Sequence, residues 1–246
     1  MNIASDINKL IIEKVASLER PDLFREPLVG FSSAKDKRYG ELKEIIGDWH
    51  LNPDELLEDA KTVISYFVPF TKEVVEEPKK VVGGSSLWGE AYAIINSYFD
   101  EINSLIIEYL NNLGYSATSI QATHTYDPKD MQSMWSHRSA AVIAGMGKFG
   151  ANRMVITEKG SAGRFCSVLT SAIIYKEMKP VEDRCLYSKN GSCGLCFKIC
   201  PVHALEPNSF NKFACQYVCN TNQKQDKFGA DTCGKCISVC PLAYIK

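Results

Sequence analysis

Two matching runs of cysteine in the last quarter of the chain limit what it can fold into more than any other feature. The first run is Cys193-Gly-Leu-Cys196-Phe-Lys-Ile-Cys200-Pro201, and the second is Cys233-Gly-Lys-Cys236-Ile-Ser-Val-Cys240-Pro241. Each cysteine of the second run follows its counterpart by the same 40 positions, so the unit is duplicated. Runs of this C-x2-C-x3-C-P form bind cuboidal iron–sulfur clusters, and the cysteine before proline reaches the other cluster. The sequence therefore predicts two [4Fe–4S] clusters that share ligands crosswise.

The two runs do not contain enough ligands by themselves. The usual run has a further cysteine three residues upstream of C-x2-C, and these positions are Asn190 and Ala230 here. Cys185 can replace it in the first copy, whereas Cys215 or Cys219 must loop back for the second. We expect cluster one to take Cys185, Cys193, Cys196 and Cys240, and cluster two to take Cys200, Cys215, Cys233 and Cys236.

Two other uses of cysteine compete with this interpretation. Paired C-x2-C elements can bind tetrahedral zinc, but zinc does not call for the C-x3-C-P tails. Disulfides are disfavoured because the chain shows no secretory signal and cytosolic thiols stay reduced. The iron–sulfur interpretation is therefore preferred.

Composition predicts a cytoplasmic, electron-handling protein with one large and one small domain. The chain has 246 residues, is 45% hydrophobic and carries a net charge of −1, which favours neither a nucleic-acid nor a membrane surface. No run approaches the roughly 18 apolar residues of a membrane span. Of ten cysteines, only Cys166 lies outside the last quarter. We expect a cysteine-poor α/β domain at 1–180 and a two-cluster domain at 181–246.

Hydrophobic periodicity predicts alternating helices and strands in the first part. We expect a layered α/β sheet there, and thus an α+β protein overall. Helices are predicted at 5–19 (capped by Ser5 or Asp6), 39–49, 87–113 and 131–144; strands at 28–31, 62–68, 115–123, 153–157 and 165–174; a mobile loop at 71–86 and a charged linker at 177–183.

Three glycines follow the predicted helix that ends at Ala144. Gly145-x-Gly147-x-x-Gly150 matches the dinucleotide fingerprint, but that motif needs a strand before it and a helix after it. Here the predicted order is the reverse. The glycines then indicate either a helix C-cap with a tight turn or backbone packed against a large flat cofactor.

Polar residues gather just before these glycines: His124, Tyr126, Asp127, Asp130, His137 and Arg138. They form either a polar loop with a capped helix or a site with a proton donor, whose pKa burial and neighbours would tune. Cys166, alone on a predicted strand, is interpreted as a core residue. His203, soon after Cys200, is a turn residue or a hydrogen-bond donor that tunes cluster one.

The order of these parts resembles that of epoxyqueuosine reductase and, more distantly, of the reductive dehalogenases. The resemblance rests on the paired cysteine runs and on the segment Arg138-x5-Ala144-Gly-Met-Gly-x-x-Gly-x-Asn152, and it covers roughly residues 25 to 246. It implies a nitroreductase-like first domain that binds cobalamin and a bacterial ferredoxin-like module that delivers electrons to the cobalt. The residues implied to bind the cofactor are Arg138, Gly145, Gly147, Gly150 and Asn152.

Three departures from that family matter. Where its members carry an aspartate thought to donate a proton, seven residues before the arginine, this chain has Met131. Asp127 or Asp130 could take the role if the loop is shifted. Ala151 replaces a lysine, and the chain stops at Lys246, without the C-terminal helical-repeat domain that helps those enzymes hold tRNA. We therefore do not expect tRNA as the substrate.

The leading functional hypothesis is a corrinoid-dependent oxidoreductase. An external low-potential donor, of ferredoxin or flavodoxin type, would reduce cluster two, and electrons would pass through cluster one to the cobalamin. The alternative is an electron-transfer or activating protein for a partner corrinoid protein, with no organic substrate of its own. A flavin in the first domain is a third possibility, which no sequence feature selects.

Overall fold

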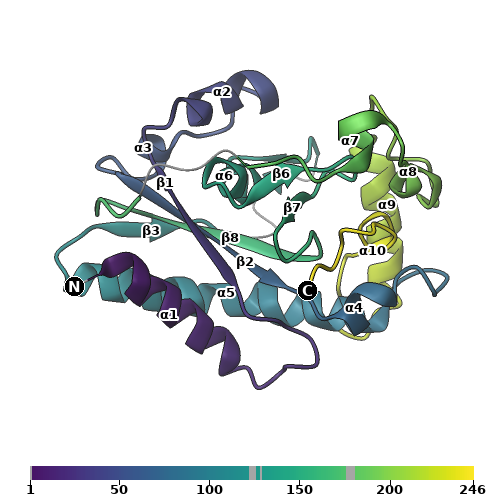
Figure 1. The fold of residues 1–246 in the computed structure, drawn as a ribbon, viewed down its shortest axis with the longest axis horizontal. Helices are drawn as coiled ribbons and strands as arrows, with labels where there is room; N and C mark the ends of the chain where they lie inside the picture. Colours follow the sequence, from purple (N-terminus) through teal and green to yellow (C-terminus); the bar gives the residue numbers. More distant parts are fainter. Residues whose placement is uncertain (1, 122–125, 128, 176–180) are drawn as a thin grey trace.

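The computed structural model describes residues 2–121, 126–127, 129–175 and 181–246. Its centre is a four-stranded antiparallel sheet (Figure 1). The strands, in spatial order, are β1 (Leu28–Ser33), β2 (Thr62–Pro69), β8 (Gly163–Thr170) and β3 (Ala117–Ser119). The mixed helix and strand content agrees with the prediction, although neighbouring strands run antiparallel throughout.

Strand β2 is buried along its whole length, as its β-branched and aromatic run predicted. It pairs with β1 on one side and with β8 on the other, so all of its neighbours are protein. Alternate residues face opposite layers. Tyr66 packs toward the long helix α5, whereas Val63 and Phe67 face the layer that contains α6.

Two helices cover the first face of the sheet. They are α1 (Ile3–Ala16) and α5 (Ser86–Asn112). Ser85 caps α5 by accepting a hydrogen bond from the Trp88 amide, and Gly114 ends it in a left-handed conformation (φ 84°). Cys166 lies in this core as predicted: it is fully buried and accepts a hydrogen bond from Asn103 (Nδ2–Sγ 3.4 Å).

The opposite face carries shorter elements, including those that frame the candidate site. They are α2 (Lys37–Ile46), α3 (Pro53–Leu56), α6 (His137–Ile143), the pair β6 (Gly147–Phe149) and β7 (Val155–Thr157), and the pair β4 (Tyr126–Asp127) and β5 (Gln132–Ser133). In Figure 1, α6, β6 and β7 lie between the sheet and the cysteine-rich part of the chain.

Some predicted boundaries were wrong. The helix expected to begin at Met131 begins at His137, because the chain first forms β5 and then the Ser136 cap. The loop expected at 71–86 contains α4 (Lys72–Glu76). The cap of α1 is Asn2 rather than Ser5 or Asp6, because its side chain accepts from the Ser5 amide. Of the predicted loop 123–130 and linker 177–183, residues 123–125, 128 and 177–180 lie outside the described residues.

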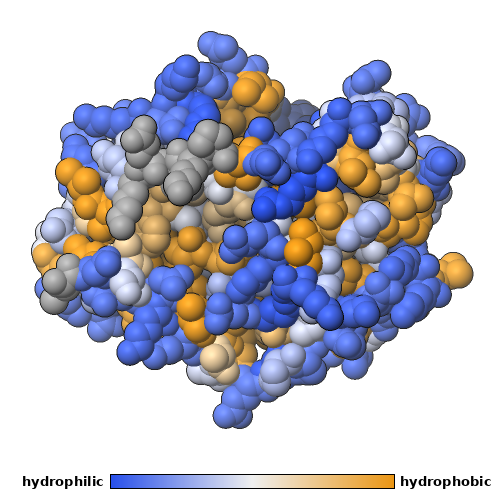
Figure 2. Space-filling view, viewed as in Figure 1, coloured by the Kyte–Doolittle hydropathy of each residue, from blue (hydrophilic) through white to orange (hydrophobic). Residues whose placement is uncertain are grey.

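The last 66 residues, 181–246, form what we call the cysteine module. It contains four helices: α7 (Leu186–Asn190), α8 (Leu195–Lys198), α9 (Lys212–Gln223) and α10 (Lys235–Ser238). It lies against one end of the sheet and against α4, and Figure 2 shows both hydrophobic and hydrophilic surface over this side of the molecule. The described residues contain no helix that is long and apolar enough to cross a membrane.

The end of the chain is hydrogen-bonded into the body, by which we mean the described part of residues 2–175. The amide of Ala162 donates to the Ala243 carbonyl (3.0 Å), and Arg25 donates to the Ile245 carbonyl (2.6 Å). The Arg25 guanidinium also lies over the Tyr244 ring, 4.3 Å from its centroid. The module and the body are thus joined by backbone contacts as well as by side-chain packing.

Candidate functional site

The cysteines assigned to cluster one share one electrostatic neighbourhood. Burial, together with the Cys240 and Cys185 thiols, raises the pKa of Cys196 to about 11. Burial likewise raises the pKa of Cys240, with Cys185 and Cys193 contributing. Each thiol of this set thus lies near other members, and the set joins both cysteine runs, as crosswise ligation requires.

The cysteines assigned to cluster two form a second neighbourhood. Burial raises the pKa of Cys236 to about 12, and Cys233, Cys215, Cys196 and Cys200 add to the shift in that order. Burial also raises the pKa of Cys233, whose nearest thiol neighbours are Cys215 and Cys200. Cys196 belongs to the first set, so the two neighbourhoods adjoin.

The donor chemistry of both neighbourhoods fits iron–sulfur clusters. All ten cysteines are free thiols. Backbone amides donate to two of the assigned sulfurs, from Ala204 to Cys200 (3.2 Å) and from Ala151 to Cys185 (3.4 Å), and such contacts favour thiolates. Among the described residues, no three His, Cys, Asp or Glu side chains meet closely enough to hold a single metal ion. In a cubane each thiolate binds a different iron. The ligands therefore surround the cluster instead of meeting at a single metal ion.

Cys185 marks the place where the cysteine module meets the polar segment of the body. Burial alone would raise the pKa of this thiol, but hydrogen bonds from the amides of Ala151 and Ser188 bring it below its usual value. Ala151 belongs to the turn that follows β6. The predicted ligand of cluster one and the predicted cofactor segment are therefore in direct contact.

Arg138 and Asn152 offer polar groups at the same turn. The Arg138 guanidinium donates to the Arg153 carbonyl (2.9 Å) and has no ion-pair partner among the described residues. The side chain is exposed, and desolvation by the surrounding protein lowers the guanidinium pKa. Asn152 is buried, and its Nδ2 has no hydrogen-bond partner in the part of the chain that the structure describes. An unpaired buried amide fits a site in which a bound group supplies the acceptor.

The three glycines are explained by the fold of the chain itself. Gly145 adopts a left-handed conformation (φ 70°) directly after α6, as a helix C-cap requires. A Cβ at Gly147 would lie 2.4 Å from the Ile156 carbonyl oxygen, and one at Gly150 would lie 2.7 Å from Ile156 Cδ1. The glycines thus allow β6 and its turn to approach β7. A cofactor is not needed to account for them.

The two candidate proton donors lie on the β4–β5 hairpin. Asp127 is exposed, and its carboxylate accepts from the Lys129 amide (2.8 Å). Asp130 is also exposed, and Lys212 of the cysteine module donates to its carbonyl oxygen (2.5 Å). Met131, which stands at the family's aspartate position, has a left-handed backbone (φ 49°). His124 lies outside the described residues.

His137 is buried in a hydrogen-bonded chain. Trp135 Nε1 donates to Ser167 Oγ (2.9 Å). Because the Gln121 carbonyl beside His137 Nε2 can only accept, the neutral ring carries its proton on Nε2, and the Ser167 hydroxyl donates to His137 Nδ1 (2.7 Å). His137 Nε2 then donates to the Gln121 carbonyl (3.5 Å). This order fixes one neutral tautomer, and burial lowers the His137 pKa to about 4. Ser167 is fully buried and its oxygen is engaged on both sides, so this pair positions α6 on the sheet.

The buried His137 predicts a pH-dependent stability. The folded pKa of about 4 lies below the unfolded value of about 6.5, so only the unfolded chain takes up this proton as the pH falls. The contribution is fully present above pH 6.5 and is lost as the pH falls toward 4. Between pH 7.5 and 5.5 we expect the free energy of unfolding to fall by about 1 kcal/mol through this group. Anaerobic urea titrations should show a shallower pH dependence for His137→Gln, whereas His203→Gln, an exposed control, should match the wild type. Equal slopes for His137→Gln and the wild type would contradict the assignment.

Arg164 was missed by the sequence reasoning. It stands near the start of β8, where Nε donates to Asn96 Oδ1 (2.9 Å) and the guanidinium lies over the Tyr92 ring (4.5 Å to the centroid). Burial is the main cause of the lowered pKa of Arg138, and the positive charge of Arg164 is the second cause. Tyr92 and Asn96 belong to α5, so the Arg164 side chain lies on the face of the sheet opposite α6. The only sequence signal was a charged residue in an otherwise apolar strand.

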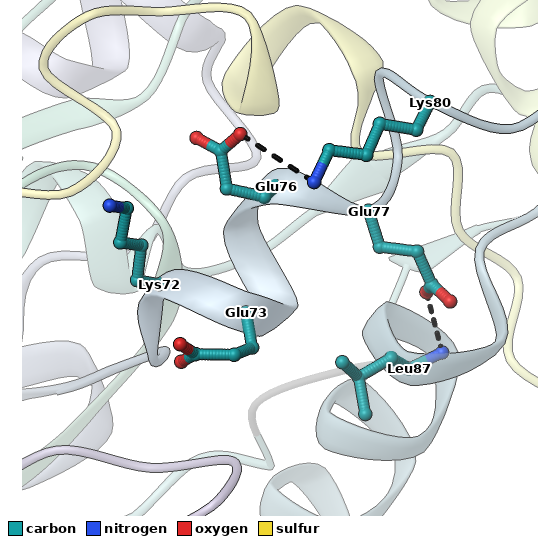
Figure 3. Close-up of a pocket in the computed structure, with 6 residues that line it drawn as sticks. All are labelled: Lys72, Glu73, Glu76, Glu77, Lys80 and Leu87. Atoms are coloured by element: carbon teal, nitrogen blue, oxygen red, sulfur yellow. Dashed lines mark hydrogen bonds and ion pairs between the residues drawn. The ribbon is translucent and has the colours of Figure 1, made fainter.

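His203 and the groove beside α4 do not belong to the candidate site. His203 is an exposed residue in a left-handed turn (φ 49°), and its amide donates to the Cys200 carbonyl (3.3 Å). The groove measures about 510 Å³ and is lined by Lys72, Glu73, Glu76, Glu77, Lys80 and Leu87 (Figure 3). Glu76 pairs with Lys79 (2.8 Å), and Glu77 accepts from the Leu87 amide (2.8 Å). Its charges are thus largely satisfied by neighbouring parts of the chain.

Known proteins of similar sequence are epoxyqueuosine reductases, although no protein-family model matches the chain. The Lactococcus garvieae (strain Lg2) protein is 26% identical over 210 residues, which cover 82% of this chain and 54% of the relative. The Bacillus anthracis protein is 23% identical over 206 residues, which cover 77% of this chain and 50% of the relative. The chain thus spans about half the length of the curated relatives it matches.

Solved structures show the same likeness at the level of the fold. The epoxyqueuosine reductase of Streptococcus thermophilus superimposes with a TM-score of 0.59 at 19% identity, covering 99% of this chain and 66% of that one. A catabolic reductive dehalogenase gives a TM-score of 0.61 at 16% identity, covering 87% of this chain and 29% of that one. The resemblance predicted from the motifs is confirmed.

Proposed function

We propose that this chain, similar to epoxyqueuosine reductases in sequence and fold, is an iron–sulfur oxidoreductase. Electrons would pass through two [4Fe–4S] clusters to a cobalamin-type cofactor held by the body, for the reduction of a small or nucleoside-like substrate. The observation that carries the proposal is the contact between Cys185 and Ala151, which joins the cluster-one thiols to the polar turn of the body. We place the cofactor at that turn.

The exposure of the thiols supports electron transfer from cluster two to cluster one. Cys185 and Cys196, assigned to cluster one, are buried, and Cys185 touches the body. The four thiols assigned to cluster two are all half-buried. An external donor reaches the more exposed centre more easily, so cluster two is the entry point and cluster one the delivery point. Hydrogen bonds to the sulfurs and solvent exposure would set their potentials.

In the body, two residues would contact the cofactor. A bound corrinoid would supply the redox reactivity, while the protein supplies binding, orientation and electrostatics. Asn152 Nδ2 has no hydrogen-bond partner among the described residues, and the exposed Arg138 guanidinium can donate from its remaining N–H groups. These donors suit the amide and phosphate oxygens of a large polar cofactor.

Elemental analysis of anaerobically purified protein tests the proposal. We expect about eight irons and as many sulfides per chain, together with about one cobalt. Flavin in place of cobalt would support the third interpretation and would refute the corrinoid. Zinc in place of iron, or fewer than about four irons after cluster reconstitution, would refute the whole proposal.

A second candidate function is favoured by Met131. In one solved structure, the Bacillus subtilis epoxyqueuosine reductase has its aspartate-bearing catalytic loop swung out of the active site. Here Met131 occupies the position of the family's aspartate, and both nearby carboxylates, Asp127 and Asp130, are exposed. A protein without a proton donor at this position could instead reduce the corrinoid of a partner protein.

The two candidates differ in where the corrinoid is found. Tight, stoichiometric cobalt in the isolated protein supports the oxidoreductase. Cobalt-free protein that, once reduced, rapidly converts a partner's cobalt(II) corrinoid to cobalt(I) supports the activator. In that second case, alanine at both Asp127 and Asp130 should leave the rate of the conversion unchanged.

A further inference from the structure

The outer face of α9 carries exposed aromatic side chains that no other described element covers. Phe213 and Tyr217 are one helical turn apart, with 54% and 71% of their surface exposed. Lys224 lies on the same face about two turns further along, and Phe210 is exposed just before the helix begins. We call Phe210, Phe213, Tyr217 and Lys224 the α9 stripe. Large apolar side chains grouped on a surface in this way mark interaction sites.

The opposite face of the same helix carries thiols of the second cluster neighbourhood. Cys215 and Cys219 lie about half a turn away from the stripe, and Cys215 is a near neighbour of Cys233 and Cys236. A protein seated on the stripe would therefore be separated from these thiols by roughly one helix diameter, about 10 Å.

The charge around the stripe is positive. Residues 207–225 contain no Asp or Glu, and they include Lys212 and Lys224. The module as a whole has eight Lys or Arg against five Asp or Glu, although the full chain has a net charge of −1. Two acidic residues adjoin this surface: Asp226 accepts hydrogen bonds from the amides of Phe228 (2.8 Å) and Ala230 (3.2 Å), and the exposed Asp130 lies beside Lys212, which donates to its carbonyl oxygen. An acidic partner is therefore attracted to this side of the molecule.

We propose that the α9 stripe is the docking surface for a small, acidic, one-electron carrier protein. Resting on the proposed function, this assigns the route by which electrons enter. The reduced carrier gives up one electron and is oxidised, and the cluster behind α9 gains that electron, with no atom transferred. An aromatic centre with a basic rim and a small area suits the short-lived complexes of electron-transfer partners.

The test follows cluster bleaching by stopped flow after mixing with a reduced flavodoxin of strongly negative charge. In Phe213→Ala/Tyr217→Ala we expect the second-order rate at low salt to fall at least tenfold. In Lys224→Glu we expect a smaller fall and a weaker dependence on ionic strength, because an attractive charge has been reversed. The control Lys37→Glu/Ile45→Ala makes comparable changes at exposed positions of α2 and should behave as the wild type.

Iron content and reduction by dithionite separate the possible failures. Wild-type protein without iron would refute the proposed function itself. Stripe variants with full iron, normal dithionite bleaching and carrier rates within twofold of the wild type would overturn the docking surface. The docking surface would also be overturned if the stripe variants kept the wild-type carrier rate but lost dimerisation or tRNA binding. The stripe would then bind a second copy of this chain or an RNA instead.

Discussion

Replacing Cys215 with alanine should remove about half of the iron from the purified protein, whereas the same change at Cys219 should remove none. The expected iron per chain is about four and about eight, respectively. The sequence left these two cysteines as alternatives, because both stand in the stretch between the cysteine runs. The structure distinguishes them by their neighbours. Cys215 is close to both Cys233 and Cys236, whereas Cys219 is close to Cys215, Cys233 and Asp231.

Cys219 has a different task in this arrangement. It lies one helical turn from Cys215 and donates a hydrogen bond to that sulfur, which lowers the Cys215 pKa to about 7. Hydrogen bonds to cluster sulfurs stabilise the reduced, more negative state. We therefore expect Cys219→Ala to keep its iron but to make the reduction potential of cluster two more negative. Redox titration followed by electron paramagnetic resonance measures this shift.

Cys166→Ala is the matched control for both variants. Cys166 is as completely buried as any cysteine of the chain, but it lies in the core against Asn103, outside the module. It should keep its full iron content while losing some stability. Full iron in Cys215→Ala together with half in Cys219→Ala would show that the assignment is reversed.

The parts that were predicted well from sequence are those with a strong local pattern. The run of β-branched and aromatic residues at 62–68 predicted a buried central strand, because only protein on every side suits such a segment. The periodic segment at 87–113 predicted α5 to within one residue at each end. The cysteine spacing predicted a duplication, and α8 and α10 follow their cysteine runs at the same offset of 40 residues, whereas the two clusters stay a prediction.

The errors arose where long-range contacts decide the local structure. The residues before His137 look helical, but they pair as the β4–β5 hairpin, and Ser136 provides the cap. No local pattern indicates that His137 lies against Ser167, that Ala151 contacts Cys185, or that Lys212 reaches Asp130. These partners are brought together only when the sheet forms and the module packs against it.

A substitution at Gly160 should show that the cysteine module depends on the body. Gly160 lies in the turn between β7 and β8, beneath the last residues of the chain. A Cβ there would lie 2.3 Å from the Ala243 carbonyl oxygen, and the backbone is left-handed (φ 104°). Alanine must therefore push the end of the chain away or move the turn, and Ala243 closely follows Cys240, an assigned ligand of cluster one.

Gly160→Ala should destabilise the protein by about 3 kcal/mol, from backbone strain of about 1 kcal/mol and overpacking of about 2 kcal/mol. Gly114→Ala isolates the first contribution, because Gly114 is also left-handed (φ 84°) but has no atom within 4 Å of the added Cβ. The control should lose only about 1 kcal/mol and keep its iron. Anaerobic urea denaturation and iron analysis measure both effects. Because a displaced tail moves Cys240, Gly160→Ala should also lose cluster one more readily. Equal behaviour of the two variants would mean that the module holds its clusters without support from the body.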